Sequence, residues 1–142
     1  MIINATQHVI NFKYGDKMLT FPPSGIEIRI STTARPMFAE DDDVFVLVET
    51  GDVVGLPPRQ KGIFYIVSTM VMGALPNRDD LIAPYEQVRD SGNVSYCKKF
   101  SVQHSVTEET KYILWAVMSG LLNGADTPEQ YLERYRQNNK EA

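Results

Sequence analysis

Two arginines and several carboxylate and amide side chains in the middle of the chain have the chemistry to bind a phosphorylated small molecule. The run Asn77-Arg78-Asp79-Asp80 joins a cation to two carboxylates, and Arg59 lies upstream in a loop rich in glycine and proline. A guanidinium binds phosphate through two parallel hydrogen bonds, and Asp and Asn oxygens accept hydrogen bonds from ribose hydroxyls or an adenine amine. The pattern alone favours the plain alternative, an exposed loop held by salt bridges.

A turn between a strand and a helix offers a second means of holding an anion. Val67-Ser68-Thr69 ends an apolar run and precedes a short helical stretch, so backbone N–H groups and the helix dipole would point outward there. The more common alternative is that Ser68 only caps the helix. Arg89, just before the turn Asp90-Ser91-Gly92-Asn93, is a further phosphate candidate of low specificity.

Residues suited to catalysis or metal binding are few. The single thiol, Cys97, lies in an expected strand, where a buried and unreactive cysteine is the favoured interpretation. Neither His8 nor His104 is followed two residues later by a hydroxyl, as phosphodiesterases with two His-x-Thr/Ser tripeptides require. The run Asp41-Asp42-Asp43 is typical of a solvated loop, because three neighbours cannot all face one ion. We therefore expect a protein with no enzymatic activity, no metal and no cofactor.

Short strands separated by turns are expected over the first 102 residues, and these strands must position the polar side chains. Ile26, Ile28 and Ile30 alternate with polar residues, which places Arg29 on the opposite face. Loops are expected at 51–62 and 77–84, and a short helix before Pro76. The expected strands are 9–14, 18–21, 26–30, 44–48, 63–67 and 94–102, of which 63–67 is apolar throughout and therefore central.

The hydrophobic period changes near residue 104, where two helices are expected to begin. Ser105 and Glu108 have the spacing of a capping box, and a nearly all-apolar segment runs to Leu122. Thr127 and Gln130 repeat this spacing for a second helix. The sequence thus predicts an α+β fold: a mostly antiparallel sheet, one short internal helix and a C-terminal helical pair. Residues 1–104 would form a β-rich ligand-binding domain and residues 105–142 a helical segment that could contact another subunit.

Composition narrows the class of partner. The chain has 142 residues, and its 14 basic and 18 acidic residues give a net charge of −4. This balance argues against duplex nucleic acid, because non-specific phosphate binding needs a basic face. One cysteine excludes a disulfide framework, and no apolar run is long enough for a membrane helix. We expect a cytoplasmic protein with no membrane partner.

Several segments, taken in order, resemble small phage-encoded proteins of the first-described Thoeris anti-defence type. The most specific part is the string Tyr65-Ile66-Val67-Ser68 followed by Arg78-Asp79-Asp80-Leu81, and the resemblance covers roughly residues 2–102. The other matching segments are Ile2 to Ile10, Pro22-Pro23-Ser24-Gly25, Ile28-Arg29-Ile30, Gly55-Leu56-Pro57-Pro58, Ile82-Ala83-Pro84 and Val88-Arg89-Asp90.

This resemblance implies a protein that binds and sequesters a signalling molecule (a sponge), and not an enzyme. Proteins of this type bind cyclic ADP-ribose isomers made by bacterial TIR-domain enzymes, and sequester the signal intact. Some hold cyclic di- or trinucleotides in a second pocket, and described members are homo-oligomers. At the matching positions, side-chain chemistry then suggests a cyclic ADP-ribose pocket formed by Arg59, Ser68, Asn77, Arg78, Asp79 and Asn93, and a second pocket with Arg29 and His104.

Two other functions stay open at this point. A hydrolase of the same signals would need a nucleophile or metal set that the sequence does not display. A phage structural or host-factor interaction protein would have no small-molecule ligand, and would keep its function when Arg78 is replaced.

Overall fold

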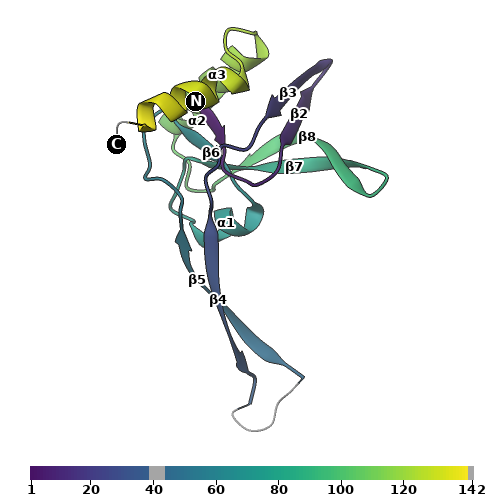
Figure 1. The fold of residues 1–142 in the computed structure, drawn as a ribbon, viewed down its shortest axis with the longest axis vertical. Helices are drawn as coiled ribbons and strands as arrows, with labels where there is room; N and C mark the ends of the chain where they lie inside the picture. Colours follow the sequence, from purple (N-terminus) through teal and green to yellow (C-terminus); the bar gives the residue numbers. More distant parts are fainter. Residues whose placement is uncertain (39–43, 141–142) are drawn as a thin grey trace.

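A six-stranded mixed sheet forms the centre of the molecule. The computed structural model describes residues 1–38 and 44–140. The order along the sheet is β1-β6-β7-β8-β2-β3 (Figure 1). Its strands are β1 (Ile2–Asn4), β2 (Ile10–Tyr14), β3 (Lys17–Phe21), β6 (Phe64–Ile66), β7 (Leu81–Asp90) and β8 (Asn93–Val102). Strands β7–β8 and β2–β3 pair antiparallel, whereas β1–β6, β6–β7 and β8–β2 pair parallel.

Strand β6 lies at the centre of the hydrophobic core, as its apolar sequence predicts. All five residues from Ile63 to Val67 are buried, and Tyr65 and Ile66 have no exposed surface. Strand β1 pairs with one side of β6 and β7 with the other. A strand covered on both faces and both edges needs apolar side chains at every position, because water reaches neither face.

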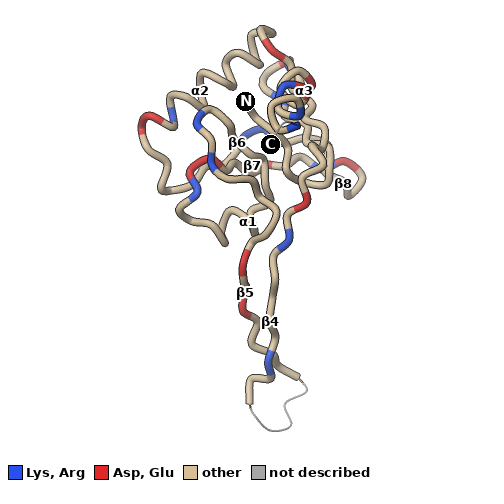
Figure 2. The backbone as a smooth tube through the Cα atoms, turned by 60° about the vertical axis from the view of Figure 1, so that its left-hand side comes forward, with Lys and Arg blue, Asp and Glu red and all other residues tan. Residues whose placement is uncertain are grey.

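A two-stranded arm projects from this body (Figure 1, Figure 2). It consists of β4 (Arg29–Pro36) and β5 (Val46–Val54), paired antiparallel. The expected strand at 44–48 and loop from residue 51 were misplaced, because pairing with β4 keeps β5 extended to Val54. The loop begins at Gly55, whose φ is +99° and where an added Cβ would lie 1.9 Å from the carbonyl oxygen of Glu27. The acidic run 41–43 lies outside the described residues.

The expected loop through Pro84 is instead part of a strand. Pro84 lies within β7 opposite Phe100 of β8. Proline is tolerated there because β6 pairs with β7 only at Leu81 and Ile82, so no neighbouring strand needs the missing N–H of Pro84.

The short internal helix forms where the sequence predicts it. Helix α1 (Thr69–Ala74) begins after Ser68, whose hydroxyl accepts a hydrogen bond from the backbone N–H of Val71. At its other end, the Gln103 side chain donates to the carbonyls of Met72 and Leu75 at 2.7 and 2.9 Å. Both ends of the helix therefore have partners for backbone groups that the helix itself leaves unpaired.

The two C-terminal helices are α2 (Glu108–Leu122) and α3 (Pro128–Asn139). The capping box at Thr127 is confirmed. The expected box at Ser105 is wrong, since Thr107 caps α2 by accepting from the backbone N–H of Thr110, and the Ser105 hydroxyl donates to the carbonyl of Pro76. Thr107 is the better cap because it directly precedes the first helical turn.

Both helices pack onto the sheet. Met118 and Leu121 of α2 and Tyr131 and Tyr135 of α3 belong to the same buried cluster as β1 and β6. The Tyr135 ring meets that of Tyr65 edge to face, with the two hydroxyls 3.4 Å apart. The structure thus has the expected α+β class. No helix among residues 1–38 and 44–140 is both long and apolar enough to cross a membrane.

Candidate functional site

The first predicted phosphate ligand, Arg59, is held by a carboxylate of the same chain. Its Nε and Nη2 donate to the two carboxylate oxygens of Asp79 at 2.6 and 3.3 Å. The Thr110 hydroxyl of α2 donates to the same carboxylate at 2.9 Å. The hydrogen bond from Arg59 lowers the pKa of Asp79 below its usual value of 3.8. This cluster links the loop before β7 to the first turn of α2.

The second predicted phosphate ligand, Arg78, lies in a more buried ion pair. Its Nε and Nη2 donate to the two oxygens of Asp80, both at 2.8 Å, and Nη2 also donates to the carbonyl of Pro57 at 2.9 Å. Only 2% of Asp80 is exposed. The hydrogen bond to Asp80 raises the pKa of Arg78 above its usual value. A bidentate pair at this burial holds the loop together and leaves little of the guanidinium for a ligand.

Ser68 does not join these arginines. It follows the C-terminal end of β6, whereas Arg78 and Asp79 precede the N-terminal end of β7. Because β6 and β7 are parallel, these two positions lie at opposite ends of the strand pair. Asn77 is exposed in the turn before Arg78. The predicted pocket is therefore divided between two ends of the sheet.

The remaining predicted residues are dispersed. Asn93 begins β8 at the turn of the β7–β8 hairpin, away from α1 (Figure 1). Arg29 begins β4, with 82% of its side chain exposed, and lies 3.6 Å from Glu27. His104 is exposed between β8 and α2. Among the described residues, no hydrogen bond or salt bridge connects Arg29 to His104.

A polar cleft of about 480 Å³ lies where β2, β7 and β8 meet. The side chains in it that can form hydrogen bonds are His8, Asn11, Gln87, Arg89, Asn93, Ser95 and Tyr96. Of these, the sequence singled out Asn93 as a site residue and Arg89 as a further phosphate candidate. The volume lies within the range of about 300–1,000 Å³ that is typical of small-molecule sites.

Arg89 gives the cleft its positive charge. It is exposed, and in the part of the chain that the structure describes it forms no salt bridge. In this it differs from Arg59 and Arg78, whose charges are already compensated. The guanidinium of Arg89 is thus available to an anion without first breaking a pair.

The amide groups of the cleft are partly held in place. The Asn11 side chain donates to the carbonyl of Ser95 at 3.2 Å and accepts from the Thr20 hydroxyl at 2.8 Å. Gln87 and Asn93, both exposed, supply further donors and acceptors beside Arg89. This set can hold a phosphate at one point and the edges of a base or sugar at others.

Cys97 lies at the base of the cleft, but as a neutral thiol. Only 2% of the residue is exposed, and burial raises its pKa to about 11. Because the thiolate is the nucleophile, a thiol with this pKa is almost wholly unreactive near neutral pH. Cys97 therefore offers the cleft no thiolate nucleophile near neutral pH.

Comparisons of the chain with models of protein families, with curated proteins and with solved structures found no match.

Proposed function

We propose that this protein is a phage anti-defence protein that sequesters cyclic ADP-ribose-type signals without cleaving them, in the cytoplasm of the bacterial host. The observation that carries the proposal is the cleft between β2, β7 and β8, where the uncompensated Arg89 lies beside amide and hydroxyl side chains. The ligand has phosphates for the guanidinium, and ribose and base edges for the amides. The sequence resemblance supplies the identity of the signal.

In this proposal the two sets of arginines have different roles. Arg89 and Asn93 contact the ligand, whereas Arg59 and Arg78 stabilise the loops through Asp79 and Asp80. Arg29 and His104 are retained as the proposed second pocket for cyclic di- or trinucleotides. A ligand in the cleft is released unchanged in this proposal, and the buried Cys97 thiol supplies no thiolate to attack it.

We also propose that the protein is a homo-oligomer, and the arm supports this. Phe38, Val46, Val48 and Val54 are 59 to 63% exposed. An isolated two-stranded ribbon is only marginally stable in water, so contact with another copy would stabilise it. Light scattering after gel filtration should give a mass that is a multiple of 16.1 kDa, and Val48→Asp should reduce it. A monomeric wild-type protein would contradict this part of the proposal.

A thermal-shift screen tests the ligand. The panel contains cyclic ADP-ribose isomers, cyclic di- and trinucleotides, and linear ADP-ribose as the control for ring closure. A ligand that binds only the folded state raises Tm by mass action, and a cyclic ADP-ribose isomer should give the largest shift. Arg89→Ala should weaken its binding by about 10- to 100-fold, the loss expected for one charge-assisted hydrogen bond.

The matched control is Arg136→Ala, because Arg136 is an exposed arginine on α3 outside the cleft. It should leave the affinity unchanged. No shift with any member of the panel would instead support a phage structural or host-factor interaction protein. An altered product recovered after incubation would support a hydrolase.

A further inference from the structure

Five of the seven lysines gather around one apolar groove, although the chain as a whole is acidic. Lys98, Lys99 and Lys111 line the groove itself. Lys13 and Lys17 line two adjoining depressions that share residues with it. Only two of these lysines have a carboxylate partner among the described residues: Lys99 lies 3.3 Å from Glu86 and Lys111 lies 2.7 Å from Glu108.

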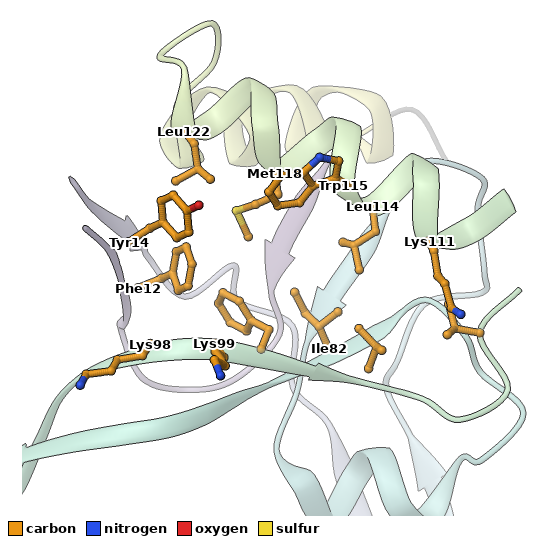
Figure 3. A pocket seen from close by; sticks show the side chains of 13 residues that line it. Phe12, Tyr14, Ile82, Lys98, Lys99, Lys111, Leu114, Trp115, Met118 and Leu122 are labelled. Atoms are coloured by element: carbon orange, nitrogen blue, oxygen red, sulfur yellow. The ribbon is translucent and has the colours of Figure 1, made fainter. Parts of the chain in front are cut away.

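The groove lies between α2 and the strands below it (Figure 3). Its volume is about 370 Å³, within the usual size of small-molecule sites. Most of its lining is aliphatic or aromatic, with Phe12, Ile82, Phe100, Leu114, Trp115 and Met118 prominent. Trp115 is 59% exposed at the opening, so the groove is accessible from solvent.

One end of the groove is polar and cationic. Tyr14 and Lys98 line both the groove and an adjoining depression that also contains Lys13 and Tyr96. The Lys13 ammonium lies 5.3 Å from the centre of the Tyr96 ring. In Figure 3 the Tyr14 hydroxyl points toward the interior of the groove, whereas the Lys98 side chain lies at its edge and points outward. Lys98 forms no salt bridge within residues 1–38 and 44–140, so its charge is available to an anion.

We infer that this groove binds a single-chain anionic amphiphile of the long-chain carboxylate type. The alkyl chain would lie along Phe100, Leu114 and Met118, where its burial is favourable. The carboxylate would lie at the polar end and accept a hydrogen bond from the Tyr14 hydroxyl, and the flexible Lys98 side chain would turn inward to bring its ammonium to the same carboxylate. The complementarity is twofold, because an apolar groove fits the chain and an unpaired lysine at its end fits the head group.

This site is independent of the proposed function. The groove itself shares no lining residue with the cleft that contains Arg89, and only Tyr96, in the depression beside the polar end, also lines that cleft. Failure of one proposal therefore leaves the other standing, and the two are tested with different ligands.

The probe is dodecanoate below its micelle concentration, and the readout is the fluorescence of Trp115, the single tryptophan of the chain. Binding should shift the emission to shorter wavelength as the indole leaves water. Dodecanol and dodecyltrimethylammonium have the same chain with a neutral and a cationic head, and both should bind about tenfold or more weakly. Butanoate has the same head without the chain and should give no shift.

Lys98→Glu should weaken the binding of dodecanoate by about tenfold or more. Lys98→Arg keeps the charge, and its affinity for dodecanoate should be close to that of the wild type. Lys140→Glu, a charge reversal at the exposed C-cap of α3 outside the groove lining, is the matched control. Isothermal titration and near-ultraviolet circular dichroism check affinity and folding without using the fluorescence shift. Equal binding of dodecanoate and dodecanol, or an unchanged affinity of Lys98→Glu, would overturn the inference. Binding to anionic vesicles or to an acidic apolar peptide, without binding to dodecanoate, would also overturn the inference.

Discussion

Replacing Arg78 by alanine should destabilise the fold and leave ligand binding intact. The change removes two hydrogen bonds of 2.8 Å to Asp80 and one of 2.9 Å to the carbonyl of Pro57. It also leaves the Asp80 carboxylate, of which 3% is exposed, without its counter-ion. Removing one partner of a buried ion pair lowers the free energy of unfolding by about 3–5 kcal/mol. Because 22% of the Arg78 side chain reaches solvent, we expect the lower end, about 3 kcal/mol.

Urea unfolding at pH 7 measures this loss. With a slope of about 1–3 kcal/mol per molar urea, Arg78→Ala should lower the midpoint by roughly 1–3 M. Adding Asp80→Asn to Arg78→Ala removes the unpaired buried charge of Asp80. The double variant should therefore be more stable than Arg78→Ala alone. Arg136→Ala, an exposed arginine, should stay within about 0.5 kcal/mol of the wild type.

Two results would refute this reasoning. A free energy of unfolding for Arg78→Ala within about 0.5 kcal/mol of the wild type would show that the pair does not hold the loop. Unchanged stability together with lost affinity for a cyclic ADP-ribose isomer would show that Arg78 contacts the ligand.

Three further predictions concern local features of the fold. Ser68→Ala removes the hydroxyl that accepts from Val71 and should cost about 1 kcal/mol in urea unfolding, whereas Ser68→Gly should cost only a few tenths. Arg59 lowers the pKa of Asp79 in the folded state. The stability that this pair contributes is therefore fully present above the unfolded-state pKa of 3.8, and it is lost as the pH falls through the lower folded-state pKa. Asp79→Asn should therefore flatten the stability profile at acidic pH, and an unchanged slope would contradict the pairing. Cys97 should react slowly with a thiol reagent at pH 8 in the native protein and rapidly in urea, because burial raises its pKa to about 11, and fast native labelling would contradict this.

Local sequence signals predicted the local structure well. The all-apolar run 63–67 forms the predicted buried strand, Ser68 caps a helix and Thr127 forms the predicted capping box. Each of these depends on residues within a few positions of one another. Pro84 was misread because a proline ends a strand only where its N–H is needed, and that depends on how far β6 extends alongside β7.

Local sequence signals could not predict the cleft in the same way. Asn11 and Ser95 meet in the cleft although they are 84 positions apart, because β2 pairs parallel with β8. No periodicity in the sequence specifies which strands become neighbours. The run Arg78-Asp79-Asp80 fits a salt-bridged loop better than a phosphate site by its pattern alone, and the structure adds that the Asp80 partner of Arg78 is buried.

The opening segment of the chain has a structural role. The buried Asn4 side chain donates to the carbonyls of His8 and Phe21 and accepts from the backbone and hydroxyl of Thr6. These bonds connect β1 to the segments around β2 and β3. The requirements of the fold therefore account for Asn4 without a ligand.

The central claim is tested most directly by recovering the ligand. Purified protein is saturated with a cyclic ADP-ribose isomer, freed of unbound ligand by gel filtration, and heat-denatured, and the released material is identified by mass spectrometry. We predict retention of the ligand by the wild type and its release unchanged, with little or none retained by Arg89→Ala. No retained ligand, a chemically altered one, or equal retention by Arg89→Ala would contradict the account.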